Sequence, residues 1–348
     1  MTKPVNTEYG PLAPPKRLLM GPGPTVVEPR IYGAMATPIV SHVDAYFFEV
    51  AEDIRKMLQV VFGTENAFTM AVSGTGSAGM EAAVANVTEP GMKFAVLANG
   101  YFSDRMEEMA RRQGAEIVRL EKAWGTVFSG EEAREFMHRE KPHVVGYVQA
   151  ETSTGAFQRG NAICEAAREV DALTIADCVT SLAGMPVRVD EAGVDVAYSG
   201  TQKALSCPPG LAPITLSARA LDRVRSRKSI LPTWYLDLRL LDSYYGESKR
   251  YHHTAPISLF YALREALRIV MEEGLENRWR RHYVNHKAFV AAAAALGMEM
   301  HVAEADQLWT LHTPVLPAGM SDTQLRSFLL REHGIEVLGG FGPLQGKV

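Results

Sequence analysis

Three short stretches of this sequence carry residue types that could bind an anion and move protons. The first is the glycine-containing run Ser73–Ser77, which precedes a segment of helical periodicity. Glycines allow backbone N–H groups at the start of a helix to approach an anion closely. No Gly-Lys-Ser/Thr follows, so the run is not a nucleotide P-loop. Taken alone, it fits a phosphate-binding turn and a plain tight turn equally well.

The other two stretches supply a carboxylate and an amine. Asp177 ends the apolar run 172–177, and Lys203 follows a polar turn after the apolar run 194–198. On its own, Asp177 is more typical of a cap and Lys203 of a solvated surface charge. Combined with an anion-binding turn, they match the needs of pyridoxal phosphate (PLP). That cofactor requires an amine for its Schiff base, a carboxylate for its pyridine nitrogen and a helix N-terminus for its phosphate.

The elements that must position these residues are short apolar runs alternating with longer amphipathic segments. Such alternation predicts βαβ units and a mostly parallel sheet, with ligands at the carboxyl ends of the strands. We expect the polar loops that follow the strands to meet at one edge. The expected strands are Ala67–Val72, Phe94–Ala98, His143–Gln149, Leu173–Ala176 and Val194–Tyr198, and the expected helices are Ser77–Val87, Phe102–Gln113 and Asn161–Val170.

The length of 348 residues, with 47% hydrophobic content, suggests one large domain and one smaller domain. The proline-containing residues 1–19 lack periodicity and are expected to form an N-terminal arm. A large cofactor-binding domain is expected over residues 20–272. A smaller α/β domain is expected over residues 273–348, because a long helical pattern at Asn277–Leu296 is followed there by shorter segments.

Charge and cysteine content argue against several classes of protein. The net charge is −4, and no basic run indicates nucleic acid or a membrane surface as partner. The three cysteines, Cys164, Cys178 and Cys207, lack metal-ligand spacing, so we expect no metal site and reduced thiols. The N-terminus has no signal-peptide pattern, and the apolar stretches are too short to span a bilayer. These features predict a soluble cytoplasmic protein.

Beyond these patterns, the run Ser199–Gly210 resembles the cofactor-lysine motif of the alanine–glyoxylate and serine–glyoxylate aminotransferases of class V. Four further segments carry the same likeness in the same order: Gly21–Pro24, Ala98–Gly100, Asp177–Ser181 and Tyr251–Thr254. The resemblance extends from about residue 17 to the end of the chain. It implies the α/β fold of type I PLP-dependent transferases, with helices on both faces of a mostly parallel sheet and a smaller C-terminal α/β domain.

The resemblance also implies a role for individual residues. Lys203 is expected to hold the cofactor covalently as an internal aldimine, and Asp177 to pair with the pyridinium nitrogen. Phe102 stands where the family usually places Trp over the cofactor face. The remaining cofactor contacts are expected from Thr75, Gly76, Ser77 (His in some relatives) and Gln202 at the phosphate and from Thr152 and Val179 along the ring. Tyr251 and Thr254 are expected to reach the phosphate of the neighbouring subunit in a homodimer that shares its active sites, and Pro22 and Gly23 to border the substrate pocket.

Plainer interpretations remain open for some of these residues. Phe102 could be a simple core residue. His252 and His253 fit structural hydrogen bonding better than acid–base catalysis. Cys207 is expected to line the pocket as a small hydrophobic residue rather than act as a nucleophile.

The implied activity is amino transfer from alanine or serine to glyoxylate or a similar 2-oxo acid. A ureidoglycine–glyoxylate transaminase is the alternative, although that branch carries Asn where this chain has Tyr251. A cysteine desulfurase is disfavoured because it needs a reactive cysteine late in the chain and none follows Cys207.

One departure from the family concerns the last residues, up to Val348. In relatives this stretch leads into a strand bearing the arginine that binds the substrate carboxylate. The small domain is therefore expected to be incomplete. A truncated, non-catalytic homologue that still folds and dimerises is the alternative from another functional class.

Overall fold

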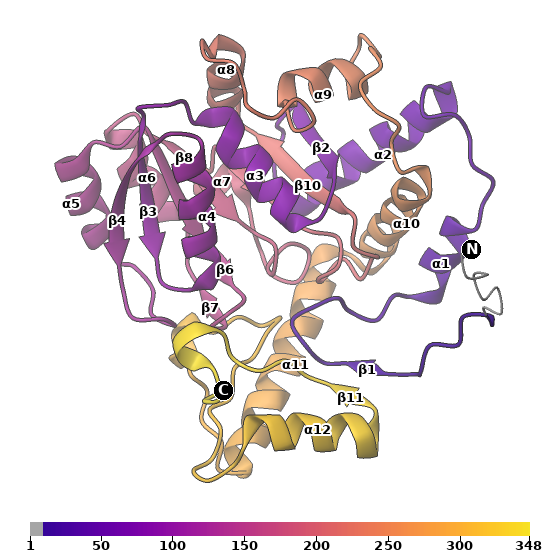
Figure 1. The fold of residues 1–348 in the computed structure, drawn as a ribbon, viewed down its shortest axis with the longest axis vertical. Coiled ribbons are helices and arrows are strands. Elements are labelled where there is room, and N and C mark those ends of the chain that lie inside the picture. The colour runs from indigo at the N-terminus through magenta and orange to yellow at the C-terminus, as the bar shows by residue number, and fades with distance from the viewer. Residues whose placement is uncertain (1–9) are drawn as a thin grey trace, which may run out of the picture.

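A seven-stranded sheet forms the centre of the computed structural model, which describes residues 10–348 (Figure 1). The strand order is β2-β10-β9-β8-β5-β3-β4, and all strands except β10 run in the same direction. The prediction of a mostly parallel sheet is thus confirmed. The strands are β2 (Phe68–Ser73), β3 (Lys93–Ala98), β4 (Glu116–Glu121), β5 (Val144–Val148), β8 (Leu173–Asp177), β9 (Val196–Tyr198) and β10 (Leu211–Leu216).

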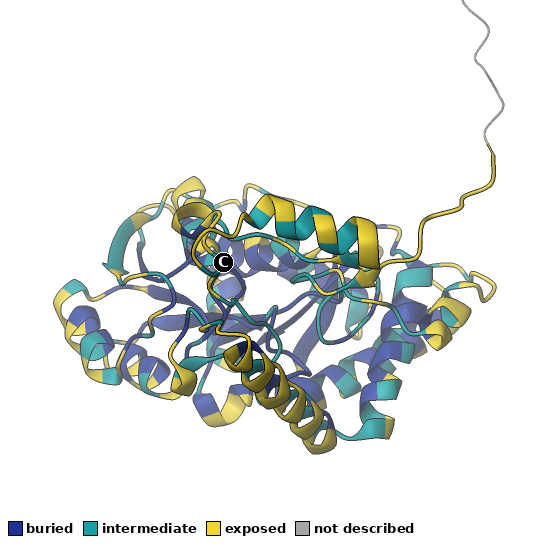
Figure 2. Ribbon diagram, turned by 90° about the horizontal axis from the view of Figure 1, so that it is seen from below, coloured by how far each residue is buried: buried dark blue, intermediate teal, exposed yellow. Residues whose placement is uncertain are grey.

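Helices cover both faces of the sheet, because successive side chains of each strand point to opposite sides. On β3, Ala95 and Leu97 belong to one buried cluster, while Phe94 and Val96 belong to the other. Figure 2 shows the buried strands between helices whose exposed residues face outward. The first cluster includes α1 (Pro29–Met35), α2 (Ala45–Phe62), α5 (Gly130–Glu140), α6 (Asn161–Glu169), α7 (Val189–Ala192) and α10 (Ile257–Glu273), and the second includes α3 (Gly76–Val87), α4 (Tyr101–Arg112), α8 (Ala218–Ser226) and α9 (Leu238–Tyr245).

Local signals explain several helix boundaries. Asp44 caps α2 by accepting a hydrogen bond from the Tyr46 N–H at 2.8 Å, and Gly63 ends this helix in the left-handed region. A capping box of Ser129 and Glu132 begins α5. None of the described helices is both long enough and apolar enough to cross a membrane.

The C-terminal elements lie below the carboxyl edge of the sheet in Figure 1. The predicted long helix is α11 (Leu275–Ala295), and none of the side chains of α12 (Asp322–His333) is buried. The short strand β1 (Leu18–Leu19), which falls in the predicted arm, pairs in parallel with β11 (Ile335–Glu336). The smaller elements are β6 (Ala150–Glu151), β7 (Ala156–Phe157) and the 3-10 turns η1 (Glu304–Asp306) and η2 (Gly342–Leu344).

Part of the predicted arm, residues 1–9, lies outside the described residues. The predicted boundary between residues 272 and 273 falls at the last turn of α10, and the division into domains stays a prediction. The expected strands correspond to β2, β3, β5, β8 and β9, and the expected helices to α3, α4 and α6. The sequence interpretation did not identify β4 and β10 as strands.

Candidate active site

Five loops that follow strands of the sheet converge on a cavity of about 200 Å³. Nine residues singled out from the sequence line it: Thr75, Gly76, Ser77, Phe102, Thr152, Asp177, Val179, Gln202 and Lys203. A larger cavity of about 370 Å³ lies between α2, β2 and α10, and none of the predicted site residues lines it. We place the chemistry in the smaller cavity, because it alone of these two brings an amine, a buried carboxylate and a helix N-terminus together.

Asp177 ends β8 and is almost completely buried. Its Oδ2 accepts a hydrogen bond from the Tyr198 hydroxyl at 2.7 Å, and its Oδ1 accepts one from the Val179 N–H at 2.9 Å. Tyr198 is also the residue paired with Asp177 in the neighbouring strand β9. Burial raises the pKa of Asp177 to about 6, although these hydrogen bonds and the cationic Lys203 and Arg105 oppose the shift.

Lys203 lies in the loop after β9 and is partly buried. Its amine donates a hydrogen bond to the Pro22 carbonyl oxygen. A Cβ added at Gly23, whose φ is +108°, would lie 2.9 Å from Cδ of Lys203, so only glycine allows this close approach. Burial lowers the pKa of Lys203, while the carboxylate of Asp177 opposes the shift. Pro22 and Gly23 therefore contact the lysine but are not among the lining residues of the cavity.

The start of helix α3 lines another side of the cavity, and Thr75 is the N-cap residue of this helix. The Thr75 side chain makes no capping hydrogen bond, so it leaves the first N–H groups of the helix without a side-chain partner. Ser77 follows in the first turn and accepts a hydrogen bond from Arg105 at 3.0 Å. Gln202 lines the same space, where its amide N–H₂ group can donate hydrogen bonds; its buried amide oxygen, which has no partner among residues 10–348, can only accept them. This end of the cavity can therefore bind an anion.

The helix α4 forms the remaining side of the cavity through Phe102 and Arg105. The guanidinium carbon of Arg105 lies 4.7 Å from the centre of the Phe102 ring. Phe102 also packs at the margin of the core cluster that includes α3 and α4. Its ring is therefore both part of the core and part of the cavity wall.

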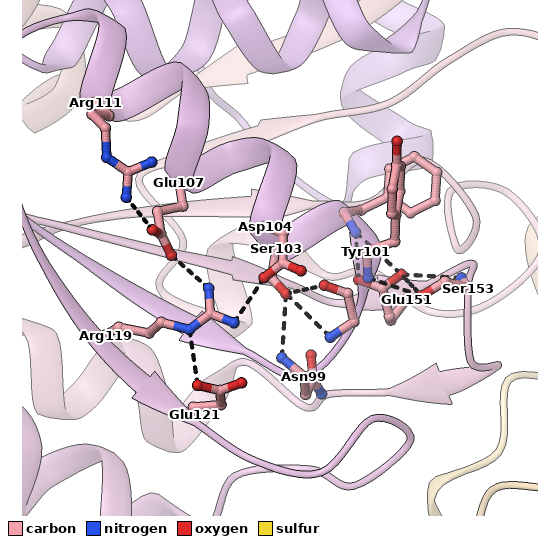
Figure 3. Close-up of polar contacts among 12 residues, drawn as sticks. Asn99, Tyr101, Ser103, Asp104, Glu107, Arg111, Arg119, Glu121, Glu151 and Ser153 are labelled. Atoms are coloured by element: carbon pink, nitrogen blue, oxygen red, sulfur yellow. Dashed lines mark hydrogen bonds and ion pairs between the residues drawn. The ribbon is translucent and has the colours of Figure 1, made fainter. Parts of the chain in front are cut away.

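Glu151 fixes the start of α4, as Figure 3 shows. Its carboxylate is buried and accepts hydrogen bonds from the Phe102 N–H at 3.2 Å and from the Ser153 N–H at 3.0 Å and hydroxyl at 2.6 Å. The backbone at Gly100 comes so close that a Cβ there would lie 2.3 Å from Cγ of Glu151. Burial raises the pKa of Glu151 to about 7, and the nearby Asp177 adds to the shift.

A second set of contacts holds α4 from its outer side. Arg119 of β4 pairs with Asp104 at 2.8 Å and with Glu107 at 2.5 Å, and it also contacts Glu121 at 3.3 Å. These groups appear together at the left of Figure 3. The cavity-facing side of α4 is thus supported both by a buried carboxylate and by ion pairs.

Two predicted residues, Tyr251 and Thr254, do not line the cavity of this protomer and are exposed. Between them, the buried His252 and His253 contact each other through their Nδ1 atoms at 2.8 Å. Nε2 of His253 lies 2.8 Å from the Ser73 hydroxyl, and Nε2 of His252 lies 3.3 Å from the Trp234 carbonyl oxygen. Burial lowers the pKa of both histidines, that of His253 to about 4.

The expectation that Cys207 lines the pocket is wrong. The side chain is buried in the core cluster on the α2 and α10 face, and burial raises the pKa of its thiol to about 12. All three cysteines are free and buried.

Sequence reasoning missed Arg105, Met80 and Glu151. Arg105 and Met80 line the cavity, and Arg105 could have been found because it lies one helical turn after Phe102 on the same face. The contact of Glu151 with Phe102 crosses 49 residues of sequence, and no local pattern signals it.

Comparison with known proteins identifies the family of this chain. The family model for class-V aminotransferases matches residues 30–342. The (S)-ureidoglycine–glyoxylate transaminase of Bacillus subtilis (strain 168) is 37% identical over 97% of this chain and 85% of its own length. The alanine–glyoxylate aminotransferase of Rattus norvegicus is 36% identical over 97% of this chain and 83% of its own length.

Solved structures agree with this result. The crystal structure of an alanine–glyoxylate aminotransferase from Nostoc sp. superimposes with a TM-score of 0.97 at 44% identity, over 98% of this chain and 90% of that one. The ureidoglycine–glyoxylate aminotransferase of Bacillus subtilis gives a TM-score of 0.95 at 39% identity, over 97% of this chain and 87% of that one. The chain therefore belongs to the class-V aminotransferase family and is a pyridoxal-phosphate-dependent aminotransferase.

Proposed function

We propose that this aminotransferase moves the amino group of a small amino acid, alanine or serine, to glyoxylate or a similar 2-oxo acid. The observation that carries the proposal is the convergence of Lys203, Asp177 and the start of α3 on one cavity. Relatives named for glyoxylate as a substrate, at 36–44% identity over nearly the whole chain, support the choice of acceptor.

The residues around the cavity fit PLP. A phosphate would be held at the start of α3 by Thr75, Gly76 and Ser77, with the amide N–H₂ group of Gln202 beside them as a further donor. Asp177 keeps lone pairs free beyond the two hydrogen bonds that it accepts, so it can pair with a protonated ring nitrogen. Thr152 and Val179 would line the ring, and Phe102 would cover one face.

The chemistry that PLP supplies when bound is an electron sink for the charge left when a proton leaves the amino acid Cα. Lys203 would hold the cofactor covalently and, once released by the amino donor, take that proton on its Nζ. The lowered pKa of this amine favours the neutral form, which can accept a proton. Asp177 would hold its negative charge against the ring nitrogen, and Pro22 and Gly23 would border the substrate beside the amine.

A visible absorption spectrum of the purified holoenzyme tests this function. Alanine or serine should remove the absorption band of the covalently held cofactor, and glyoxylate should restore it. Lys203→Ala should abolish the covalent band and lower the turnover rate by about 10²–10⁴-fold, as expected for loss of a general base. Lys228→Ala, at an exposed lysine, is the matched control.

The same experiment separates the alternatives. A response to (S)-ureidoglycine in place of alanine and serine would assign the chain to the activity named for its Bacillus relatives. Binding of PLP without a response to any amino donor would instead indicate a non-catalytic homologue.

We further propose a homodimer in the cytoplasm, in which Tyr251 and Thr254 reach the phosphate bound by the partner. Tyr251 is 60% exposed and lies beside His42, and the exposed Trp234 stacks on His252 nearby. Exposed aromatic rings next to a predicted partner site support an interface there.

Subunit mixing tests this shared site. Lys203→Ala and Tyr251→Ala protomers, unfolded and refolded together, should regain about a quarter of wild-type activity, because half of the random dimers carry one complete site. Each variant refolded alone should stay low. If mixing brings no recovery, Tyr251 serves its own subunit or none.

A further inference from the structure

Arg105 is a cavity residue with no role in the function proposed so far. It lies on α4 one turn after Phe102, is partly buried, and lines the same cavity as Lys203 and Asp177. Its Nη1 donates a hydrogen bond to the Ser77 hydroxyl at 3.0 Å, and its guanidinium carbon lies 4.7 Å from the Phe102 ring centre. The Ser77 hydroxyl of α3 and the Phe102 ring of α4 thus hold the Arg105 guanidinium beside the start of α3.

The charge of Arg105 is left without a carboxylate partner. Within residues 10–348, the structure gives it no ion pair, whereas Arg111 and Arg112 on the same helix pair with Glu107 and Glu108 at 2.5–3.1 Å. A partly buried cation without a paired carboxylate loses hydration, which the contact with the Phe102 ring and the nearby Asp177 replaces only in part. Its orientation toward the cavity therefore points to an anion that belongs there.

The other charges around the cavity indicate which anion this is. Lys203 and Asp177 are the remaining charged side chains that line it, and the proposed function engages both of them with the ring and the substrate. A phosphate dianion at the start of α3 would then have only the partial positive charge of the helix and neutral donors for balance. Among residues 10–348, Arg105 is the one lining cation still available, and its hydrogen bond already directs it to Ser77.

We propose that Arg105 binds the phosphate group of the cofactor, jointly with the first turn of α3. Its planar guanidinium can donate two parallel hydrogen bonds to phosphate oxygens while its face stays against Phe102. In this role it couples the phosphate end of the site to the aromatic side chain that covers the ring. The inference rests on the proposed function, since it requires that PLP occupies this cavity.

The experiment compares two ligands that differ only in the phosphate. Dissociation constants for PLP and for pyridoxal are measured on protein freed of cofactor, for wild type, Arg105→Met, Arg105→Lys and the control Arg112→Met. Arg105→Met should weaken PLP binding by about 10- to 100-fold and change pyridoxal binding by less than about twofold. The PLP affinity of Arg105→Lys should lie between those of wild type and Arg105→Met, because lysine keeps the positive charge but cannot donate two parallel hydrogen bonds. Arg112→Met should bind PLP as tightly as wild type.

Three results would overturn the proposal. Equal weakening of PLP and pyridoxal would mean that Arg105 only supports the ring through Phe102. Unchanged PLP binding would mean that Arg105 does not contact the phosphate. A raised KM for the amino donor with unchanged PLP binding would assign Arg105 to the substrate carboxylate.

Thermal melting of each cofactor-free variant identifies any general loss of fold. If Arg105→Met melts early, the comparison between the two ligands is made with Arg105→Lys, which preserves the aliphatic stem. Failure of the proposed function itself is recognised separately, because the wild-type holoenzyme would then bind PLP but show no spectral response to alanine or serine.

Discussion

The two sides of the active-site cavity are held in place in different ways. We call the side formed by β8, β9 and Asp177 the sheet wall, and the side formed by Phe102 and Arg105 the α4 wall. In the sheet wall, one of the two hydrogen-bond donors to Asp177 is its own partner in the strand ladder, Tyr198. In the α4 wall, the position of Phe102 depends on Glu151, which ends the short strand β6. One wall is thus built into the register of the sheet, and the other depends on tertiary contacts.

This difference has an electrostatic counterpart. Both walls contain a buried carboxyl group whose pKa is raised by burial, Asp177 to about 6 and Glu151 to about 7. Asp177 has a cationic amine and guanidinium nearby, whereas the hydrogen bonds to Glu151 come from neutral groups. We therefore expect Asp177 in the sheet wall to stay charged at neutral pH and Glu151 in the α4 wall to change its protonation close to neutral pH.

The largest effect is expected from Asp177→Asn in the sheet wall. Loss of the charge at the ring nitrogen should lower the turnover rate by about 10²-fold or more. The cofactor-free protein should nevertheless become more stable at neutral pH, because the folded state disfavours the charged carboxylate. Since the folded pKa is raised from 3.8 to about 6, the wild type loses free energy of unfolding as pH rises through that window.

Thermal melting with and without PLP, between about pH 4 and pH 8, checks this prediction. The stabilising effect of the Asn substitution should appear above about pH 4 and grow up to about pH 6, on the order of 1–3 kcal/mol. Equal stability of both proteins at every pH would contradict the electrostatic account of the sheet wall.

A smaller effect is expected from Glu151→Gln in the α4 wall. The amide keeps an acceptor for the Phe102 N–H but loses the charge that strengthens this bond, so PLP affinity should fall by about three- to tenfold. The wild-type folded state favours the protonated acid, so its stability should fall as pH rises from about 4.5 to about 7. The Gln variant should lack this step.

The readout that distinguishes the two walls is the pH dependence of PLP binding. Wild-type affinity should decline as Glu151 protonates below about pH 7, while the Gln variant should be flat in that range. Glu108→Gln, on the exposed face of α4, is the matched control. If the Gln variant and the wild type share one pH profile, the α4 wall does not depend on the charge of Glu151.

The sequence predicts the sheet wall well because its information is local. Apolar runs followed by polar or glycine-containing turns place Asp177, Lys203 and the start of α3 at one edge of a parallel sheet. The α4 wall is only half predictable. Phe102 follows from the family resemblance, but its support by Glu151 comes from a contact across 49 residues of sequence.

Other differences have similarly physical reasons. The strand β10 runs antiparallel between β2 and β9 and contains Pro213, a residue that argues against a central strand in a sequence pattern. Cys207 is close to Lys203 in sequence, but the turn between them directs it into the core. Proximity along the chain therefore did not predict a shared cavity.

The contact between His252 and His253 has a consequence for acid sensitivity. Two Nδ1 atoms 2.8 Å apart can share only one hydrogen, so one ring donates and the other accepts. If His252 donates through Nε2 to the Trp234 carbonyl oxygen, then His253 donates through Nδ1 and accepts from the Ser73 hydroxyl. A further proton on His252 enters at its accepting Nδ1 and brings two hydrogens face to face, and a further proton on His253 enters at Nε2 and displaces the hydrogen that the Ser73 hydroxyl donates.

Either protonation works against the folded state as the solution is acidified. The folded state lowers the pKa of His253 from 6.5 to about 4. The contribution of the neutral ring to stability is therefore fully present above about pH 6.5 and is lost as the pH falls from about 6.5 to about 4. Ser73 directly precedes the turn that starts α3, and Tyr251 and Thr254 flank the two rings. Protonation of this histidine pair would thus weaken two features at once. One is the hydrogen bond that holds Ser73 before the anion-binding turn, and the other is the position of the segment that is proposed to contact the second subunit.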